Sequence, residues 1–134
     1  MKQLTQDLWQ TSLYSSGMLN THAYFLQRPE GNVLFYNTAN ESDLQEIAQL
    51  GGIQTQFLTH KDEAASSQSR IRREFNSELV TSELEAPHIV RYSPVDIEIK
   101  QTQDSYNGIQ ILHTPGHTDG SVCFIYKSPH GQTY

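Results

Sequence analysis

The sequence predicts an α/β fold in which helices cover one layer of sheet that includes parallel strands. Three observations indicate this class. The first third of the chain alternates short apolar and polar runs, as half-buried strands do. A segment with helical spacing follows, and an apolar run typical of a buried strand comes directly after it. Because a strand–helix–strand order implies a right-handed crossover, we expect the two flanking strands to be parallel.

The first strands are expected at residues 8–13, 23–27 and 32–36. Residues 28–31 separate the last two strands and read Arg-Pro-Glu-Gly, which is typical of a turn. We therefore expect the chain to reverse direction between them.

Two helices are expected next. Ser42 and Gln45 have the spacing of a capping box, in which each side chain satisfies a backbone N–H at the start of a helix. Gly51 marks the end of this helix, because a left-handed residue is wanted there. A strand at residues 53–59 and a second helix at residues 64–75 follow.

The rest of the chain has a less regular pattern. Pro87 and Pro94 interrupt residues 78–100, and we expect only short strands in that region. Residues 109–113 and 121–126 alternate more clearly and predict two further strands.

Composition excludes several classes of protein. The length of 134 residues leaves room for one domain, placed at residues 1–134. Nine basic against fifteen acidic side chains give a net charge of -6, which argues against a nucleic-acid partner. With Cys123 as the one cysteine, no intrachain disulfide can form. The first residues lack the apolar run of a signal peptide and no segment approaches membrane-spanning length. We therefore expect a cytoplasmic protein with no membrane partner.

Side chains that bind metals follow two of the predicted strands. His60 stands at the carboxyl end of the strand at residues 53–59, where open α/β sheets keep their functional groups, and Asp62 follows closely. His117 lies beyond the strand at residues 109–113, on a Pro-Gly turn that would project it past the strand end. Two imidazoles and one carboxylate make a three-ligand set that leaves one position open.

These two segments resemble the metal-binding motifs of the metallo-β-lactamase superfamily. In that family one strand ends in Thr-His-x-His-x-Asp-His, and a later strand ends in Thr-Pro-Gly-His-Thr-x-Gly-Ser. Residues 114–121 match the second motif at every defined position, and Thr59 and His60 match the start of the first. Residues 20–24 also resemble the family's second strand, so the similarity extends over most of the chain.

The first motif departs from the family pattern. Asp62 stands where the family has its second histidine, and Ala65 where it has the last. Ala64 stands where it has the aspartate that binds the second metal and helps to activate water. Because an alanine methyl can neither coordinate nor take a proton, the resemblance implies that the second metal site is lost. The first site would keep His60 and His117, with Asp62 as a carboxylate substitute of the kind that some iron-binding relatives have. One weakly held zinc or iron ion is the implied cofactor.

The resemblance also implies an αββα sandwich built of two similar halves. Residues 129–134 resemble the tip of a hairpin that precedes the family's Gly-Asp segment, whose aspartate bridges the metals. We therefore expect this chain to cover mainly the N-terminal half of a metallo-β-lactamase-like sandwich. An apolar sheet face would then be exposed, which favours a homodimer.

Several polar residues have a structural interpretation beside the functional one. Asp62 is as well suited to capping the second helix as to binding a metal. Glu63 is a candidate substitute base, although an exposed residue at the helix start is favoured. His113 alternates with apolar neighbours and is expected in the sheet interface, and Cys123 is expected in the core. A surface position is favoured for the other histidines, His22, His88 and His130.

Two hypotheses for function remain. The first is a metal-dependent, hydrolase-like protein with a reduced site that acts on a small ester or thioester. Its metal would polarise a carbonyl and acidify a water. The second is a non-catalytic member of the fold that binds a ligand or a partner protein. Ala64 and Ala65 favour the second hypothesis where efficient hydrolysis is concerned, and no catalytic residue can be named from the sequence. In either case the expected partner is a small-molecule substrate or ligand.

Overall fold

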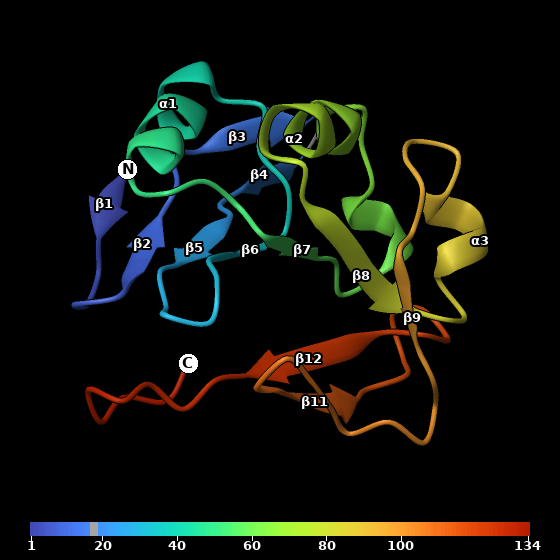
Figure 1. The fold of residues 1–134 in the computed structure, drawn as a ribbon. Helices are drawn as coiled ribbons and strands as arrows, with labels where there is room; N and C mark the ends of the chain where they lie inside the picture. The colour runs from blue at the N-terminus through green and yellow to red at the C-terminus, as the bar shows by residue number, and fades with distance from the viewer. Residues whose placement is uncertain (17–18) are drawn as a thin grey trace.

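A computed structural model describes the backbone of residues 1–16 and 19–134, and its largest element is a seven-stranded sheet (Figure 1). The strands lie in the order β1-β2-β5-β6-β7-β8-β9. Their bounds are β1 Lys2–Gln3, β2 Leu8–Gln10, β5 Tyr24–Leu26, β6 Val33–Phe35, β7 Thr55–Phe57, β8 Glu78–Ser82 and β9 Ile97–Ile99.

Two smaller sheets accompany it. One contains β10 (Ser105–Tyr106), β11 (Ile109–His113) and β12 (Val122–Ile125), and the other pairs β3 (Tyr14–Ser16) with β4 (Leu19–Thr21). The helices are α1 (Glu41–Gln49), α2 (Ser67–Phe75), the short α3 (Ala86–Ile89) and a 3-10 turn, η1 (Lys61–Glu63).

Parallel pairing confirms the expected crossover. β5 and β6 are antiparallel across the predicted turn, whereas β6 pairs in parallel with β7 after α1, and β7 pairs in parallel with β8 after α2. β9 extends the parallel part of the sheet beyond β8. The carboxyl ends of four strands therefore meet at one edge of the sheet, the edge at which α/β proteins place their functional groups.

The large sheet is covered on both faces. α1 and α2 lie on one face, and the sheet of β11 and β12 lies on the other (Figure 1). Side chains that alternate along the strands supply both contacts, because successive residues point to opposite faces. Phe25 and Leu34 pack with Leu44 under the helices, whereas Leu26 and Val33 pack toward the second sheet. The single sheet layer expected from the sequence is thus wrong, since β10 to β12 form a layer of their own.

Local signals placed α1 and α2 but misassigned where they begin, and α3 was not expected. α1 is capped by Asn40, whose side chain accepts from the N–H groups of Ser42 and Asp43, so the expected capping box of Ser42 and Gln45 is wrong. Gly51, with φ +105°, follows the helix as predicted. In the irregular region Pro87 lies in the first turn of α3, where a missing N–H costs nothing, instead of interrupting a strand.

The two ends of the chain are joined through Asp7, which is buried. Ser128 donates to its Oδ2 at 2.6 Å, and the hydroxyl of Tyr134 donates to its Oδ1. Thr5 also donates to Asp7, at 3.1 Å. The segment after β12 is therefore held against the first strands by hydroxyl groups.

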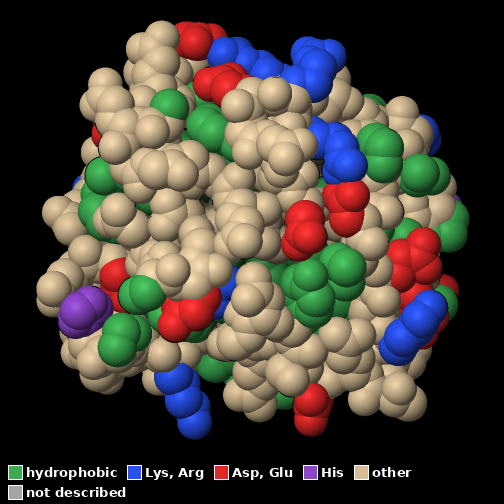
Figure 2. Space-filling model, viewed as in Figure 1, with side chains coloured by type: hydrophobic (Ala, Val, Ile, Leu, Met, Phe, Trp, Pro, Cys, Tyr) green, Lys and Arg blue, Asp and Glu red, His purple; other side chains and the backbone are tan. Residues whose placement is uncertain are grey.

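Charge on the surface is mixed. Figure 2 shows acidic and basic side chains interspersed over the face in view, as expected for a chain of net charge -6. In the described part of the chain, no helix has the length and apolar character needed to cross a membrane.

Candidate metal site

The structure brings together the three side chains expected at a metal site. His60 follows β7, Asp62 lies in η1, and His117 lies in the loop between β11 and β12. Each offers one ligand atom, and these atoms lie within 4.8 Å of one another. Nε2 of His117 is 2.8 Å from Oδ2 of Asp62, and the two imidazole rings meet edge to face with centroids 4.8 Å apart.

Main-chain and side-chain bonds hold the two loops against each other. The N–H of Val122, at the start of β12, donates to the carbonyl of Thr59 at 3.1 Å. Glu85, just before α3, is 2% exposed and bridges both loops. Its Oε2 accepts from the N–H of Lys61 at 2.7 Å, and its Oε1 accepts from the N–H of Gly120 at 2.8 Å. One buried carboxylate thus links the His60 loop to the His117 loop.

Hydrogen bonds within residues 114–121 build the loop that carries His117. Thr114 N–H donates to Ser121 O at 2.9 Å, and the hydroxyls of Thr118 and Ser121 lie 2.7 Å apart. Gly120 was expected to let the chain turn, but the structure gives a steric reason. A Cβ at this position would lie 2.7 Å from Oε1 of Glu85, so a side chain would displace the bridging carboxylate.

The surroundings of His60 favour the neutral form of its imidazole. Burial lowers the pKa of His60 below its ordinary value, and the nearby His117 lowers it further against the opposing effect of Asp62. A neutral imidazole is the form that binds a metal, so this environment favours ligation over protonation.

Glu63 is buried, and its expected exposed position at a helix start is wrong. Its Oε2 accepts from the N–H of Thr59 at 2.7 Å, its Oε1 accepts from the Thr59 hydroxyl, and Oε1 lies 3.7 Å from Nε2 of His60. Burial raises the pKa of Glu63 to about 7, although the bonds from Thr59 oppose the shift. α2 starts at Ser67, beyond this segment, so Asp62 does not cap it either.

Beside the site, Ala64 and Ala65 leave a small hollow of about 30 Å³. A volume of this size holds about one water molecule. Its wall includes Tyr36, a residue with φ +74° at the end of β6. A positive φ strains the backbone of a large non-glycine residue, and strained residues of this kind cluster at active sites and ligand-binding sites.

Most of the other histidines lie where they were expected. His113 is half-buried on the side of β11 that carries Ile109 and Ile111, with Nε2 2.7 Å from Gln103 O. His88 and His130 are exposed. His22 is half-buried, with Nδ1 2.7 Å from Thr11 O. Cys123 is exposed on β12, so its expected place in the core is wrong.

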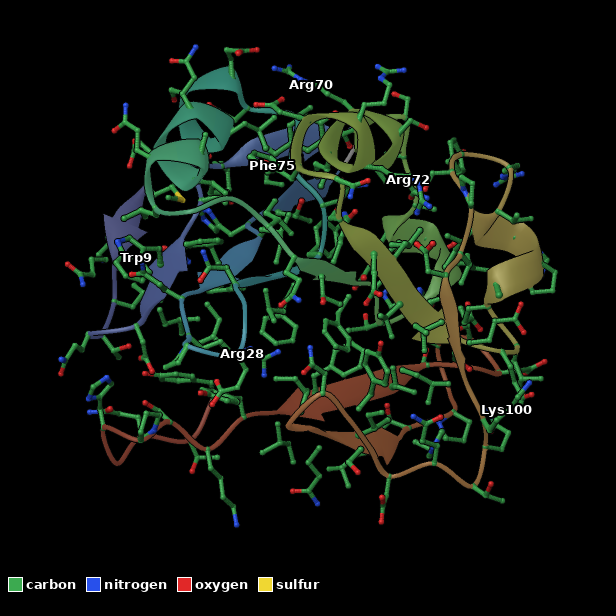
Figure 3. All side chains as sticks on the ribbon, viewed as in Figure 1. Trp9, Arg28, Arg70, Arg72, Phe75 and Lys100 are labelled. Carbon is green, nitrogen blue, oxygen red and sulfur yellow. The ribbon has the colours of Figure 1, made fainter. Side chains whose placement is uncertain are left out.

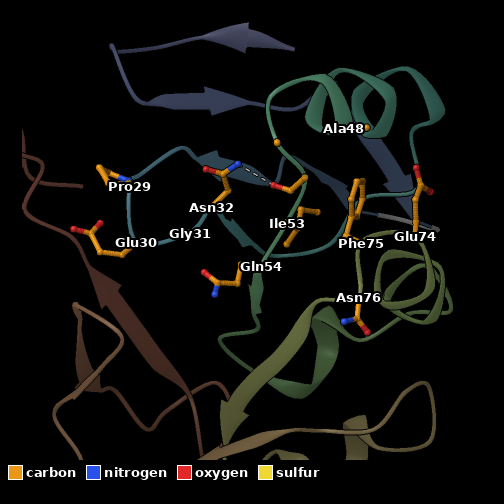
Figure 4. A pocket seen from close by; sticks show the side chains of 12 residues that line it. Pro29, Glu30, Gly31, Asn32, Ala48, Ile53, Gln54, Glu74, Phe75 and Asn76 are labelled. Atoms are coloured by element: carbon orange, nitrogen blue, oxygen red, sulfur yellow. Dashed lines mark hydrogen bonds between the residues drawn. The ribbon is translucent and has the colours of Figure 1, made fainter.

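A larger hollow lies elsewhere (Figure 4). It measures about 810 Å³ and is formed where the chain enters β6 and β7, at the opposite ends of the parallel strands from His60. Asn32 donates across it to Gly52 O at 3.0 Å. Because it is broad and open and holds none of the metal-binding group, it does not belong to the site.

The donor set fits a single metal ion. Two imidazoles and one carboxylate suit zinc or ferrous iron, and they leave open positions for water or a substrate. Ala64 and Ala65, at the positions that the resemblance assigns to the second metal, offer no donor atom. His60, Asp62 and His117 would therefore hold one ion at most.

Removal of the Glu85 carboxylate should disturb the site from a distance. Glu85→Ala is expected to lower the free energy of unfolding by about 2–6 kcal/mol, because two backbone N–H groups each lose an acceptor at a cost of ~1–3 kcal/mol. Affinity for Zn²⁺ should fall ~10–100-fold, as for a group that orients metal ligands. Urea melts and metal titration measure both effects. Glu98→Ala, at an exposed position on β9, is the matched control. Unchanged affinity in Glu85→Ala would show that the loops keep their spacing without it.

The sequence did not single out Glu85, and it offered Glu63 only as a substitute base and not as a buried residue. Neither lies in a periodic pattern that marks it as buried, and their partners are backbone N–H groups, which every residue carries. A buried carboxylate of this kind is visible only once the loops are folded.

Comparison with known proteins shows the fold. No family model matches the sequence, and no curated protein matches it either. Among solved structures, a mutant of the HARLDQ-motif metallo-β-lactamase from Cronobacter sakazakii has a TM-score of 0.78 at 18% identity, covering 98% of this chain and 60% of that one. A mutant of FEZ-1 metallo-β-lactamase from Legionella gormanii has a TM-score of 0.72 at 18% identity, covering 99% and 60%. A B3 metallo-β-lactamase with an active-site glutamic acid has a TM-score of 0.71 at 16% identity, covering 98% and 59%.

The chain spans about 60% of the length of these solved chains. The resemblance inferred from residues 114–121 and from His60 is thus confirmed at the level of the fold. The chain has the metallo-β-lactamase fold, of which it covers mainly one half.

Proposed function

We propose that this chain binds one metal ion through His60, Asp62 and His117 and uses it as a hydrolase-like protein on a small ester or thioester. The convergence of the three ligand atoms within 4.8 Å carries the proposal. Asp62 supplies the anionic ligand in place of a histidine, and a carboxylate in the active site has a precedent in the B3 metallo-β-lactamase described above. The ion would polarise a carbonyl and lower the pKa of a bound water.

The residues of this chain would hold the substrate at an open surface. The side chains of Asp62 and His117 are 52% and 66% exposed, so a substrate would reach the site without a lid. Glu63 accepts a hydrogen bond from Thr59, and its carboxylate lies 3.7 Å from the imidazole of His60. We therefore expect Glu63 to orient the imidazole of His60.

A second candidate function is a non-catalytic module that binds a small ligand or a partner. Two observations favour it. Ala64 replaces the residue that would take a proton, and the hollow beside the site has room for about one water. A protein with this function would keep the fold and the metal-binding group but would not turn over a substrate.

Metal analysis and a substrate panel separate the two functions. We expect weakly held metal at no more than one ion per chain, because the site offers three ligands at most. Elemental analysis after purification without added metal measures this, and two tightly bound zinc ions would contradict it. The panel contains nitrocefin, S-lactoylglutathione and p-nitrophenyl esters with added zinc, iron or manganese.

We expect no nitrocefin hydrolysis and at most slow ester or thioester cleavage, because general-base assistance worth ~10²–10⁴-fold is missing at Ala64. Turnover that needs metal and is lost in His117→Ala supports the hydrolase. Absence of turnover despite bound metal supports the non-catalytic module. Turnover that survives His117→Ala contradicts both.

We also propose that a second copy of the chain covers an apolar groove on the sheet. The groove measures about 290 Å³ and is lined by Leu8, Tyr24, Phe35, Phe124, Tyr126 and Tyr134. Tyr24 is 37% exposed at its rim, so Tyr24→Lys should place a charge in the contact and shift the chain toward monomer. Light scattering with size exclusion measures the mass, and Leu112→Lys on the outer face of β11 is the control. A monomer at all concentrations in the unmodified chain would refute the dimer.

A further inference from the structure

Arg28 is a buried cation that is only partly paired. It is 6% exposed and lies at the start of the turn between β5 and β6. Its Nε donates to Gly31 O at 2.7 Å, and its Nη1 donates to Asn107 O at 2.6 Å. Among the described residues its Nη2 has no acceptor. Burial lowers the pKa of Arg28 below its ordinary value, and Tyr126 and Glu30 oppose this only in part. A buried charged donor without an acceptor calls for an explanation, because it loses hydration and gains no bond in return.

Two loops from different sheets converge on this guanidinium. Asn107 and Gly108 join β10 to β11 with φ of +49° and +76°, as an Asn-Gly hairpin turn requires. The turn offers the carbonyl of Asn107 to Arg28, and a Cβ at Gly108 would come within 3.4 Å of Nη1. Figure 3 shows Arg28 between the β5–β6 turn and the segment that follows β12. The side chain is thus fixed in place at two of its three nitrogens.

Arg28 lines a cavity of about 490 Å³. The Cζ of Arg28 lies 5.9 Å from the ring centroid of Tyr126, which also lines the cavity. Lys127 brings a second positive charge to the rim, and Pro29 and Pro129 give the cavity apolar sides. Cavities of this volume suit small organic molecules. A place where two basic side chains line one cavity stands out in a chain of net charge -6.

We propose that this cavity binds a small carboxylate with a flat apolar body, such as an aromatic acid. The carboxylate would accept from Nη2 of Arg28 and lie near Lys127, and the flat body would pack against Tyr126 and the prolines. Glu30 also lines the cavity, and its charge disfavours a doubly charged anion such as phosphate. Because Nη2 has almost no exposed surface in the free chain, the ligand must displace a neighbouring group to reach it. The site lies apart from the metal group and does not depend on it.

Calorimetric titration of the 134-residue chain tests the proposal with three probes. Benzoate is the carboxylate with a flat body, benzamide is its neutral analogue, and inorganic phosphate is an anion without a body. We expect saturable binding of benzoate, with benzamide and phosphate each at least ~10-fold weaker, because a bond between charged partners is about twice as strong as a neutral one. Equal binding of benzamide would overturn the need for the charge. Equal binding of phosphate would overturn the need for the apolar body.

Variants that remove a charge at the rim of the cavity test the proposal without removing bonds that hold the fold. Arg28→Met should abolish binding but also removes bonds to two loops. Lys127→Met is therefore expected to weaken benzoate about 5-fold, and Glu30→Gln to strengthen it about as much, since one charge is removed near the carboxylate in each case. Lys100→Met, at an exposed residue outside the cavity, is the control and should leave the affinity unchanged. Absence of saturable benzoate binding, or the same affinity in both rim variants, would overturn the proposal.

Discussion

Replacement of Phe57 by alanine is expected to lower the free energy of unfolding by about 3–5 kcal/mol. Phe57 is fully buried on β7 between the two sheets, where its ring meets the ring of Phe124 edge to face at 4.9 Å. Phe35 and Tyr106 lie at 5.6 and 6.2 Å from it. The loss would be a large share of the ~5–15 kcal/mol that stabilises an ordinary domain. Urea unfolding followed by circular dichroism measures it.

Two controls test whether the effect comes from the lost volume. Phe57→Leu keeps most of the volume and should cost less than about 1.5 kcal/mol. Phe75→Ala removes an aromatic ring that is partly buried at the edge of α2, and its cost should be clearly smaller than that of Phe57→Ala. Equal costs for Phe57→Ala and Phe75→Ala would contradict the role of Phe57 as the centre of the contact between the sheets.

Replacement of His117 by alanine is expected to remove metal binding. A group that only orients a metal ligand is worth ~10–100-fold in affinity, so loss of one of three direct ligands should cost more than this. Titration with Co²⁺, followed by its visible absorption, measures the affinity of the chain and of the variant. His130→Ala removes an exposed imidazole outside the group and should leave the affinity unchanged.

The Asp62 carboxylate needs a separate test, because in the structure it also accepts a hydrogen bond from His117. Asp62→Asn keeps an oxygen that can accept this bond but removes the negative charge that a metal ligand supplies. A large loss of Co²⁺ affinity in Asp62→Asn would identify Asp62 as a ligand. If Asp62→Asn binds as well as the unmodified chain while His117→Ala does not, Asp62 only orients His117 and the three-ligand site is wrong.

The parts of the fold that were predictable are those with strong local signals. Alternating residues marked β5 and β6, and the crossover through α1 to β7 followed from element order alone. His60 and His117 could be paired in advance because both lie in segments that resemble the metal-binding motifs of the metallo-β-lactamase superfamily. The sequence could also indicate that Ala64 and Ala65 lack donor atoms, since this depends on residue type and not on geometry.

Features that depend on distant partners were not predictable. Cys123 alternates with buried neighbours in β12, but which side of a short strand faces the core depends on the sheet that packs on it. In the sequence Glu63 resembles an exposed residue at a helix start, and only the folded structure shows that Thr59 donates a hydrogen bond to its carboxylate. Asn40, and not Ser42, caps the helix because its side chain accepts from two backbone N–H groups at once. The spacing of residues in the sequence does not decide which of two neighbouring polar residues is the cap.

The anchoring of residues 128–134 on Asp7 makes this end of the molecule sensitive to acid. Burial opposes the charge on Asp7, but the hydroxyls of Ser128, Tyr134 and Thr5 outweigh it and hold the pKa of the carboxyl below its usual value. A carboxyl with a lowered pKa in the folded state contributes stability above its unfolded pKa and loses it as the pH falls through the folded pKa. Neutral and mildly acidic solutions therefore keep the segment in place. Stronger acid would weaken this attachment, and because Tyr134 lines the apolar groove, the aromatic surface exposed to solvent would grow.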